Sequence, residues 1–225
     1  MLIGIVGLIG SGKDTVANRL VEKHGYVRDS FVKSLKDAVA SMFNWDREML
    51  EGNTDSSRHW REQPDKFWSE RFGKTVTPRW VLQHFGTEVM RGQMYDGIWV
   101  DSCIGRYKGQ NTVISDTRFV NEIKTIKAHG GIILCVKRGE LPTQKQMQEQ
   151  GAHKSEWDWL DSDFDIVIDN NGTVLNKTEF NKAENFKHKL LFKENNNFVN
   201  FHSIFKIYLF IIFTFSIFYY LRKNA

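Results

Sequence analysis

The sequence has few of the residues that build disulfide frameworks and rigid loops, with two cysteines and three prolines among 225 residues. Cys103 and Cys135 lack the spacing of a metal site, and we expect both to be reduced residues of a cytoplasmic protein, Cys135 within an apolar strand. No secretory signal precedes the first apolar run, Leu2–Val6. The absence of a Gly-x-Ser-x-Gly elbow argues against a hydrolase with a Ser/His/Asp triad.

An excess of charge is also missing from most of the chain. Residues 1–175 carry 23 Lys and Arg against 24 Asp and Glu, whereas residues 176–225 carry 8 against 3. The pI near 9.0 therefore reflects the tail. The first 175 residues give no electrostatic reason to expect nucleic-acid binding.

The tail 176–225 differs from the rest in composition as well. All 17 Gly, 3 Pro and 7 Trp lie before residue 173, while 10 of the 17 Phe lie after residue 175. We favour a translated shifted frame or run-on, because the tail consists mostly of residues with A/T-rich codons. The alternative is a membrane anchor within residues 204–221, where residues 207–221 carry no charge. A spanning helix needs about 20 apolar residues, so an anchor would have to include Lys206.

A glycine loop is present at Gly7–Thr15, and it matches the pattern G-x-x-x-x-G-K-[ST] except that Asp14 occupies the Ser/Thr position. The run Leu2–Val6 before it suits a buried strand, and residues 14–22 after it suit a helix. Such loops turn backbone N–H groups and a helix N-terminus toward phosphate oxygens, and Lys13 would reach the terminal phosphates. We therefore predict nucleotide binding in preference to a turn without a ligand.

Asp14 is the unusual residue of this loop. Its carboxylate would meet the phosphates with like charge unless it points away from them or acts through a magnesium ion and its waters. Thr15 offers a hydroxyl one residue later. Another interpretation, which does not exclude the first, is that Asp14 stabilises the positive N-terminal end of its helix.

Apolar segments and helical segments alternate over the first 175 residues. Strands are expected at 2–6, 26–31, 111–115, 132–136 and 165–169, and helices at 14–22, 32–43, from Pro78 onward and at 118–129. Residues 45–73 mix charged and aromatic residues without a repeated period, and they begin a helical insertion over about 45–105. The pattern predicts an α/β fold with a mostly parallel sheet, helices on both faces, and ligands at the carboxyl ends of the strands.

Phosphoryl transfer depends mainly on positioning and on neutralising the charge of the moving group. Asp116 ends the strand 111–115 and could hold a magnesium ion through water, although capping of the following helix explains it nearly as well. Trp99 is by default a core residue, although its indole could stack on a base. His153, near Ser155 and Glu156, has no assigned role. A single arginine is usually solvated, so the case for an acceptor phosphate site rests on how many arginines lie in segments that flank predicted strand ends. They are Arg58, Arg61, Arg79, Arg91, Arg118 and Arg138.

Six blocks of sequence occur together: Gly-Ser-Gly-Lys-Asp-Thr at 10–15, Leu-Lys-Asp-Ala at 35–38, Thr-Pro-Arg-x-x-Leu-Gln-x-Phe-Gly-Thr-Glu at 77–88, Ile-Trp at 98–99, Asp-Thr-Arg-Phe-x-Asn-Glu at 116–122 and Asp-Asn-Asn-Gly-Thr at 169–173. In combination they resemble the deoxynucleoside monophosphate kinases of tailed bacteriophages, over about residues 1–175. That family has a P-loop kinase fold and transfers the γ-phosphate of ATP to a deoxynucleoside 5′-monophosphate for phage DNA synthesis. The resemblance implies the same fold and chemistry here, with the insertion binding the acceptor.

The resemblance also implies roles for single residues. ATP would contact Gly10, Gly12, Lys13, Asp14, Thr15 and, on a mobile segment, Arg138. The acceptor would contact Lys36, Arg79, Gly86, Thr87, Trp99, Asp116, Arg118 and Glu122. Catalysis would depend on Lys13, Arg79, Asp116 and Arg118, and Mg²⁺ on Thr15 and Asp116, through water. Because Glu122 lies four residues after Arg118, an intrahelical ion pair between them is an alternative that could also orient Arg118.

We therefore expect a kinase that uses ATP and Mg²⁺ to phosphorylate a deoxynucleoside monophosphate in the cytoplasm of an infected bacterial host. No nucleic-acid partner is expected, and the family points to a homodimer. One alternative is another small-molecule P-loop kinase, such as a dephospho-coenzyme A kinase. The other is a catalytically silent nucleotide-binding protein tethered to a membrane by residues 207–221.

Overall fold

The computed structural model describes residues 1–171. The tail 176–225, with its candidate anchor 204–221, lies outside the described residues. Within residues 1–171, no helix combines the length and the apolar character needed to cross a membrane. Cys103 and Cys135 are both free and buried.

The centre of the described part is a sheet of five strands in the order β2-β3-β1-β4-β5, with every neighbouring pair parallel. The strands are β1 (Leu2–Val6), β2 (Val27–Asp29), β3 (Thr112–Ile114), β4 (Ile132–Lys137) and β5 (Ile166–Asp169). All five residues of β1 are buried, and Ile3 pairs with Val113 on one side and Ile132 on the other. The predicted α/β fold with a parallel sheet is confirmed.

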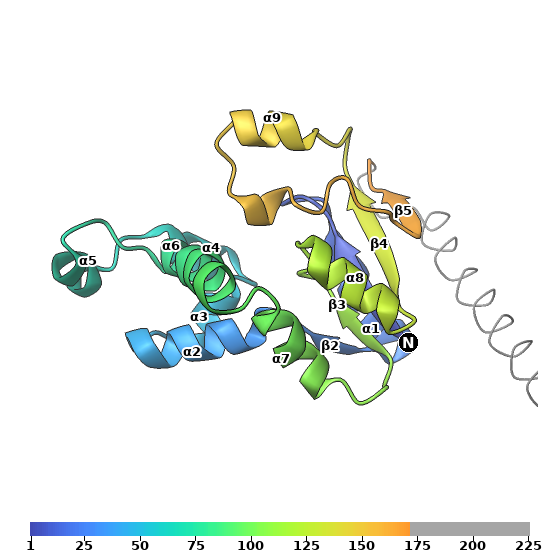
Figure 1. Cartoon of the computed structure of the whole chain (residues 1–225), viewed down its shortest axis with the longest axis horizontal. Coiled ribbons are helices and arrows are strands. Elements are labelled where there is room, and N and C mark those ends of the chain that lie inside the picture. The colour runs from blue at the N-terminus through green and yellow to red at the C-terminus, as the bar shows by residue number, and fades with distance from the viewer. Residues whose placement is uncertain (172–225) are drawn as a thin grey trace, which may run out of the picture. The chain divides into compact units, whose positions relative to one another are not determined.

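Helices cover both faces of this sheet. A Cβ on Gly4 would lie 2.5 Å from Ile126 Cδ1 of α8 (Val120–Ala128), so this helix packs directly on β1 (Figure 1). Successive side chains of a strand point to opposite faces. Ile5 therefore faces the other layer, where α1 (Lys13–His24) contacts β1 and β3.

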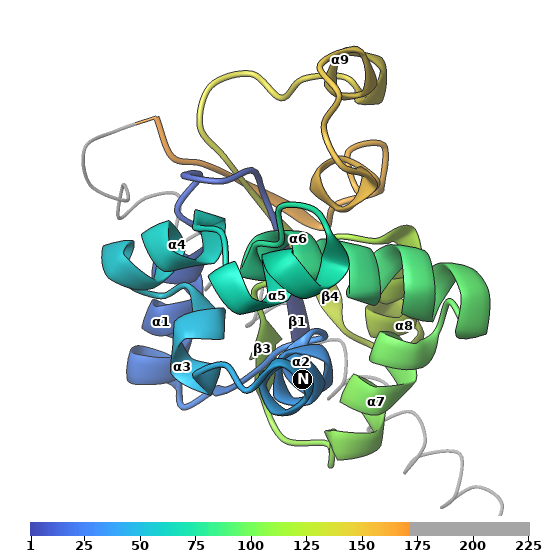
Figure 2. The same cartoon turned by 90° about the vertical axis from the view of Figure 1, so that its left-hand side faces the viewer.

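A helical insertion with its own core separates β2 from β3. Its elements are α2 (Lys33–Phe43), α3 (Arg47–Glu51), α4 (Asp55–Glu62), α5 (Lys66–Phe72), α6 (Pro78–Gln83), a π-helix (His84–Met94) and α7 (Ile98–Arg106). Leu35, Trp45, Val81 and Trp99 are among the residues that bury one another in this second core. The insertion extends to one side of the sheet, with α5 at its far end in Figure 1, and Figure 2 looks onto it. The sequence placed this insertion at about 45–105, whereas its helices begin earlier, with α2 at Lys33, and end at Arg106.

Two helices differ from the sequence prediction in type or length. The helix that begins at Pro78 changes to π-helical hydrogen bonding after Gln83 and continues so to Met94. The helix predicted from residue 118 begins at Val120, because the Glu122 side chain turns back and caps the backbone just before it.

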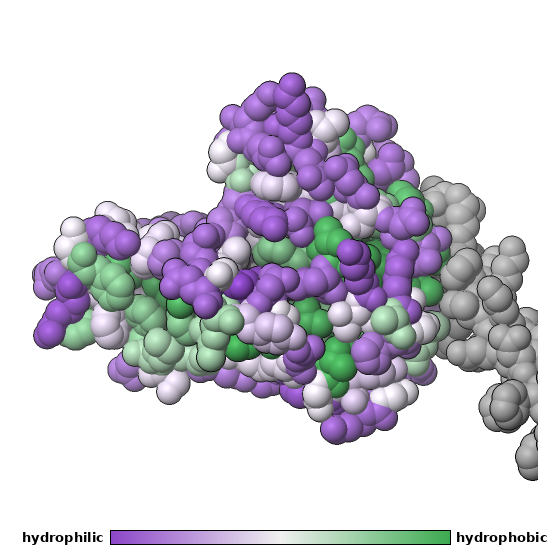
Figure 3. Space-filling model, viewed as in Figure 1, coloured by the Kyte–Doolittle hydropathy of each residue, from purple (hydrophilic) through white to green (hydrophobic). Residues whose placement is uncertain are grey.

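The polar stretch after β4 also contains a helix that the prediction missed, α9 (Gln144–Glu149). Thr143 accepts a hydrogen bond from Gln146 N, and Gln146 caps Thr143 in return. This capping box, Thr-x-x-Gln, is a recognised start signal for helices and is visible in the sequence. The surface over α9 is hydrophilic in Figure 3, and none of its residues is buried.

Candidate active site

The backbone of the loop between β1 and α1 favours glycine. Gly10 and Gly12 have φ angles of 79° and 95°, in the left-handed region. A Cβ on Gly12 would lie 2.5 Å from Asn170 Nδ2, which donates to Ser11 O at 2.9 Å. The residue after β5 therefore holds the loop, and α1 begins directly after it at Lys13. The predicted order of strand, glycine loop and helix is confirmed.

Lys13 lies within electrostatic reach of groups that are far away in the sequence. Burial lowers the pKa of Lys13, Asp14 acts to raise it, Arg118 lowers it further, and Glu156 and Asp116 raise it. The loop lysine is thus placed beside the segment that follows β3. A phosphate group bound here would favour the charged form of Lys13.

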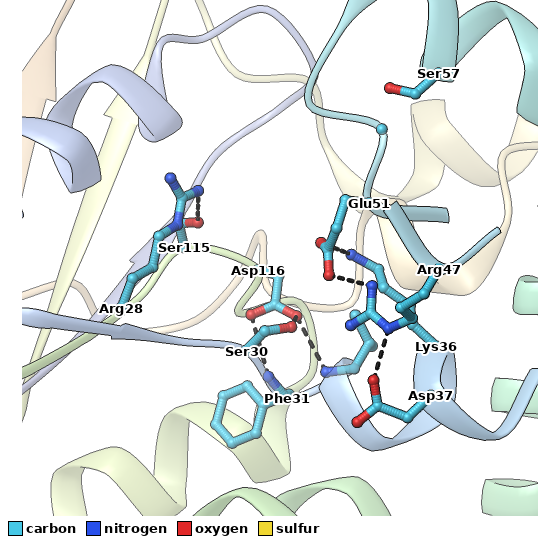
Figure 4. A network of polar contacts seen from close by, with 12 residues as sticks. Arg28, Ser30, Phe31, Lys36, Asp37, Arg47, Glu51, Ser57, Ser115 and Asp116 are labelled. Atoms are coloured by element: carbon cyan, nitrogen blue, oxygen red, sulfur yellow. Dashed lines mark hydrogen bonds and ion pairs between the residues drawn. The ribbon is translucent and has the colours of Figure 1, made fainter. Parts of the chain in front are cut away.

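The Asp14 carboxylate has a cationic partner on β2. Its Oδ1 accepts hydrogen bonds from Arg28 Nη2 and, at 3.1 Å, from Ser115 Oγ. Arg28 also donates to Ser115 Oγ at 2.6 Å, a contact drawn in Figure 4. Opposite charge on β2 therefore offsets the charge of Asp14 beside the predicted phosphate site. Asp14 also lies in the first turn of α1, where a carboxylate stabilises the helix N-terminus.

Asp116 follows β3 and holds the turn before α2. Its Oδ2 accepts from Ser30 Oγ at 2.7 Å and from Val32 N at 3.2 Å, and its Oδ1 accepts from Phe31 N at 3.2 Å (Figure 4). Arg106 of α7 supports the same turn by donating to Ser30 O at 2.9 Å. The alternative that Asp116 caps the helix after it is wrong, because its carboxylate reaches back to the start of α2.

Arg79 of α6 and Arg118, just before α8, meet at one carboxylate. Glu156 Oε1 lies 3.6 Å from Arg79 Nη2 and 2.7 Å from Arg118 Nη1. Arg79 also pairs with Glu62 at 3.2 Å. Two of the six arginines grouped from the sequence thus share one carboxylate, and both Arg118 and Glu156 act electrostatically on Lys13.

Arg61 of α4, another of the six arginines considered from the sequence, joins this group, although it was given no role in the predicted site. Burial lowers its pKa, and the positive charges of Arg79 and Arg118 lower it further. Its guanidinium lies against Gly52, where a Cβ would be 2.2 Å from Cζ, and its buried Nε has no hydrogen-bond partner among the described residues. No sequence signal separates Arg61 from Arg58, which pairs with an exposed aspartate at 2.6 Å.

Glu122 lies beneath the site, with 1% of its surface exposed, and pairs with Arg91 of the π-helix. Its carboxylate also accepts the backbone N–H groups of Arg118 at 2.7 Å and Phe119 at 3.1 Å. Burial raises the pKa of Glu122 to about 7, against the opposing effect of Arg91. The alternative of an intrahelical ion pair between the side chains of Arg118 and Glu122 is wrong, because Arg118 precedes α8 and its side chain turns to Glu156.

The other predicted acceptor contacts lie in the insertion. Trp99 is 5% exposed, and its indole N–H donates to Gly86 O at 2.9 Å, which places it in the core of the insertion. Lys36 pairs with Glu51 at 2.6 Å (Figure 4). Thr87 is partly exposed on the π-helix directly after Gly86. The default interpretation of Trp99 as a core residue therefore fits the structure better than stacking on a base.

Two predicted nucleotide contacts lie at the edges of the glycine loop. Arg138, the first residue after β4, donates from Nε to Asn170 O at 3.1 Å, and Asn170 is the residue whose amide holds the loop. Thr15 is exposed in the first turn of α1. The contact of Arg138 with ATP stays a prediction, as does the contact of Thr15 with Mg²⁺.

Comparison with known proteins finds a matching family, a curated protein of similar sequence and similar solved structures. The profile of a family described as deoxynucleotide monophosphate kinase matches residues 61–180. A curated protein of Acanthamoeba polyphaga mimivirus, named "Putative deoxynucleotide monophosphate kinase", is 30% identical over 189 residues, covering 77% of this chain and 90% of the relative. Among solved structures, shikimate kinase from Bacteroides thetaiotaomicron aligns at 12% identity and a TM-score of 0.36, covering 85% of this chain and 98% of its own. The matched family region contains Arg61, Arg79, Asp116 and Arg118.

Proposed function

The chain belongs to the deoxynucleotide monophosphate kinase family, and from this we propose that it transfers the γ-phosphate of ATP to a deoxynucleoside 5′-monophosphate. The observation that carries the proposal is the convergence of Lys13 with Arg79 and Arg118 at the carboxyl ends of β1 and β3. One loop there suits a triphosphate, and arginines from a separate insertion suit the phosphate of a second nucleotide. Products of the reaction would be ADP and a deoxynucleoside diphosphate, a DNA precursor in an infected host cell.

In this proposal the protein acts by positioning and by charge. A phosphate oxygen of the acceptor attacks the γ-phosphorus of ATP in line, and the bond from this phosphorus to the bridging oxygen of ADP breaks. Lys13 would bind the β- and γ-phosphates, while Arg79 and Arg118 would hold the acceptor phosphate. Arg61 would be a third acceptor arginine, because its buried Nε has no hydrogen-bond partner among the described residues. Four cations in one place stabilise the charge that develops on the transferred group.

The donor set of the site also fits Mg²⁺, which prefers oxygen ligands and keeps several of its waters. The Thr15 hydroxyl would bind the ion, and the Asp116 carboxylate would hold one of its waters, since its Oδ1 accepts only the Phe31 N–H, at 3.2 Å, among the described residues. When bound with ATP, the ion neutralises charge on the β- and γ-phosphate oxygens. Backbone N–H groups at Gly10 and Gly12 would bind ATP, and Arg138 would flank it.

The remaining residues of the predicted acceptor site differ in this proposal in whether they contact the acceptor or hold a residue that does. Thr87, on the exposed side of the π-helix, would contact the acceptor nucleoside. Trp99 holds Gly86 O in place, and Glu122 holds the backbone of Arg118. Lys36, paired with Glu51, would reach the acceptor only by exchanging this partner. The buried residues therefore act through others.

The test is ADP release by the full-length protein with ATP and Mg²⁺, using dGMP, dTMP, dCMP, dAMP, their ribose counterparts and dephospho-coenzyme A as acceptors. ADP that appears only with deoxynucleotides supports the proposal and shows which bases are accepted. Turnover with dephospho-coenzyme A alone would identify a different P-loop kinase. ATP binding without ADP release for any acceptor, together with recovery of the protein in membranes, would support the tethered binding protein instead.

A further inference from the structure

Glu156 is a carboxylate in the middle of the cations that the proposed function uses. Its Oε1 contacts both Arg118 and Arg79, and its negative charge acts on Lys13. Only 17% of the Glu156 side chain is exposed. Positive groups packed this closely repel one another in a partly buried place. A single carboxylate at their centre offsets this repulsion.

The backbone around Glu156 is attached to both walls of the site. Asp158 accepts the first N–H of α8 at 3.0 Å, and Trp159, which is 2% exposed in the sheet core, donates to Glu156 O at 3.1 Å. On the other side, His153 Nε2 lies 3.2 Å from Glu88 Oε1 of the π-helix. The carboxylate of Glu156 is therefore carried by a segment that links the sheet to the insertion.

Glu156 holds only one end of the Arg118 guanidinium. The side-chain hydrogen bonds of Arg118 to described residues all start from Nη1, which donates to Glu156 Oε1 at 2.7 Å and to Ser155 O at 3.5 Å. Nη2 and Nε are left for another acceptor. A guanidinium is planar and binds phosphate best through two parallel N–H groups, so fixing Nη1 sets the direction of the edge formed by Nη2 and Nε.

We propose that Glu156 is a positioning residue, which holds Arg118 and Arg79 side by side with their remaining N–H groups directed at the acceptor phosphate. The inference rests on the proposed function, because it assumes that these arginines bind a phosphate. Glu156 itself does not contact the reacting atoms in this arrangement. Its negative charge and its fixed oxygen both contribute, the charge by limiting repulsion and the oxygen by orienting Arg118.

The experiment compares Glu156→Gln and Glu156→Ala with Glu149→Gln in the full-length protein. Glutamine keeps an oxygen for Arg118 but loses the charge, and alanine loses both. Glu149 provides the matched control, because it undergoes the same change in the same stretch of chain, and its ion pair within residues 1–171 is with the exposed Lys145, at 3.9 Å. Initial rates give kcat and the KM of each substrate, calorimetry gives the Kd of the deoxynucleotide without turnover, and thermal melting monitors folding.

We expect kcat/KM for the acceptor to fall by about tenfold in Glu156→Gln and about a hundredfold in Glu156→Ala, with unchanged KM for ATP. The Kd of the acceptor should rise in the same order, and Glu149→Gln should match the wild type. A lower acceptor KM in Glu156→Gln would overturn the inference, since it would mean that Glu156 competes with the phosphate. An equal fall in kcat/KM for ATP and for the acceptor would overturn it too. If the wild type binds the deoxynucleotide but releases no ADP, the proposed function fails, while the Kd series still decides the role of Glu156.

Discussion

Lys13 is the first residue of α1, directly after the glycine loop. Its ammonium forms no ion pair within 4 Å among residues 1–171, although nearby carboxylates act on its pKa. Replacing Lys13 with Ala should lower kcat by about a hundredfold or more, because one preorganised cation at the transferred group is worth about 3 kcal/mol. Rates of ADP formation at saturating ATP and acceptor measure this. Melting temperatures of mutant and wild type should agree, since a partly buried ammonium adds little to stability. A mutant with near-normal kcat would contradict the assignment of the loop.

Arg61 offers a test in which binding and stability move in different directions. Replacing Arg61 with Met keeps most of the apolar stem and removes the guanidinium, so the KM for the acceptor should rise by about tenfold. The melting temperature should stay the same or rise, because the folded protein no longer carries a partly buried charge whose Nε lacks a hydrogen-bond partner among the described residues.

The matched control for Arg61 is Arg58→Met, on the same helix, whose guanidinium pairs with the exposed Asp55. This change should leave the acceptor KM unaltered, since surface pairs of this kind contribute little. If Arg61→Met lowers the melting temperature and leaves the KM unchanged, Arg61 is a structural residue and not an acceptor contact.

Among the elements, the connection from α8 to β4 depends on glycine more strictly than its sequence shows. A Cβ on Gly131 would lie 2.5 Å from Leu2 O and 2.8 Å from Ile126 O, both backbone atoms that cannot move alone. Gly131→Ala should therefore lower the free energy of unfolding by about 1–3 kcal/mol, the usual cost of overpacking. Urea denaturation followed by circular dichroism measures this.

Gly105, within α7, is the control for that change. A Cβ there meets nothing within 4 Å, so Gly105→Ala should raise the free energy of unfolding by about 0.5–1 kcal/mol through the lower entropy of the unfolded chain. Equal destabilisation by both alanines would show that the close approach at Gly131 is not what limits the connection.

The order of elements was predictable from the sequence because apolar periodicity, glycine turns and helix caps are local. Thr77, just before the predicted start at Pro78, caps α6, and its Oγ1 accepts from Trp80 N at 3.1 Å. The π-helix that follows was not predictable, since its apolar spacing also fits an α-helix and only the hydrogen bonding differs. The capping box of α9 is visible in the sequence, but the helix was missed because residues 139–153 are polar and show no apolar periodicity.

At the scale of the whole described part, the site joins segments whose meeting no local pattern encodes. The glycine loop was recognisable because all of its chemistry lies within Gly7–Thr15. The partnership of Asp14 with Arg28 on β2 required the strand order, because β3 separates β2 from β1. The roles of Glu156 and Arg61 could be recognised only once the fold showed how the insertion packs against the sheet. Residues of one motif could thus be assigned from the sequence, whereas residues that act by convergence could not.

The buried ion pair between Arg91 of the π-helix and Glu122 of α8 links the insertion to the sheet. Replacing Glu122 with Gln leaves Arg91 only the more distant carboxylate of Asp96, at 3.7 Å, among the described residues, and removing one partner of a buried pair costs about 3–5 kcal/mol. Glu122→Gln should lower the free energy of unfolding by this amount in urea denaturation. Arg91 would then also hold α8 less firmly, so the acceptor KM of the folded variant, measured without urea, should be higher than that of the wild type.

The control for Glu122 is Glu140→Gln, which breaks an ion pair with Lys137 at 3.8 Å in which the Glu140 side chain is 98% exposed. Its expected effect on unfolding is below about 1 kcal/mol, because water screens such pairs. If Glu122→Gln is as mild as Glu140→Gln, the carboxylate of Glu122 does not carry the link, and packing alone joins the two cores. If both the stability and the acceptor KM change only in Glu122→Gln, one buried pair couples the acceptor arginines to the stability of the fold.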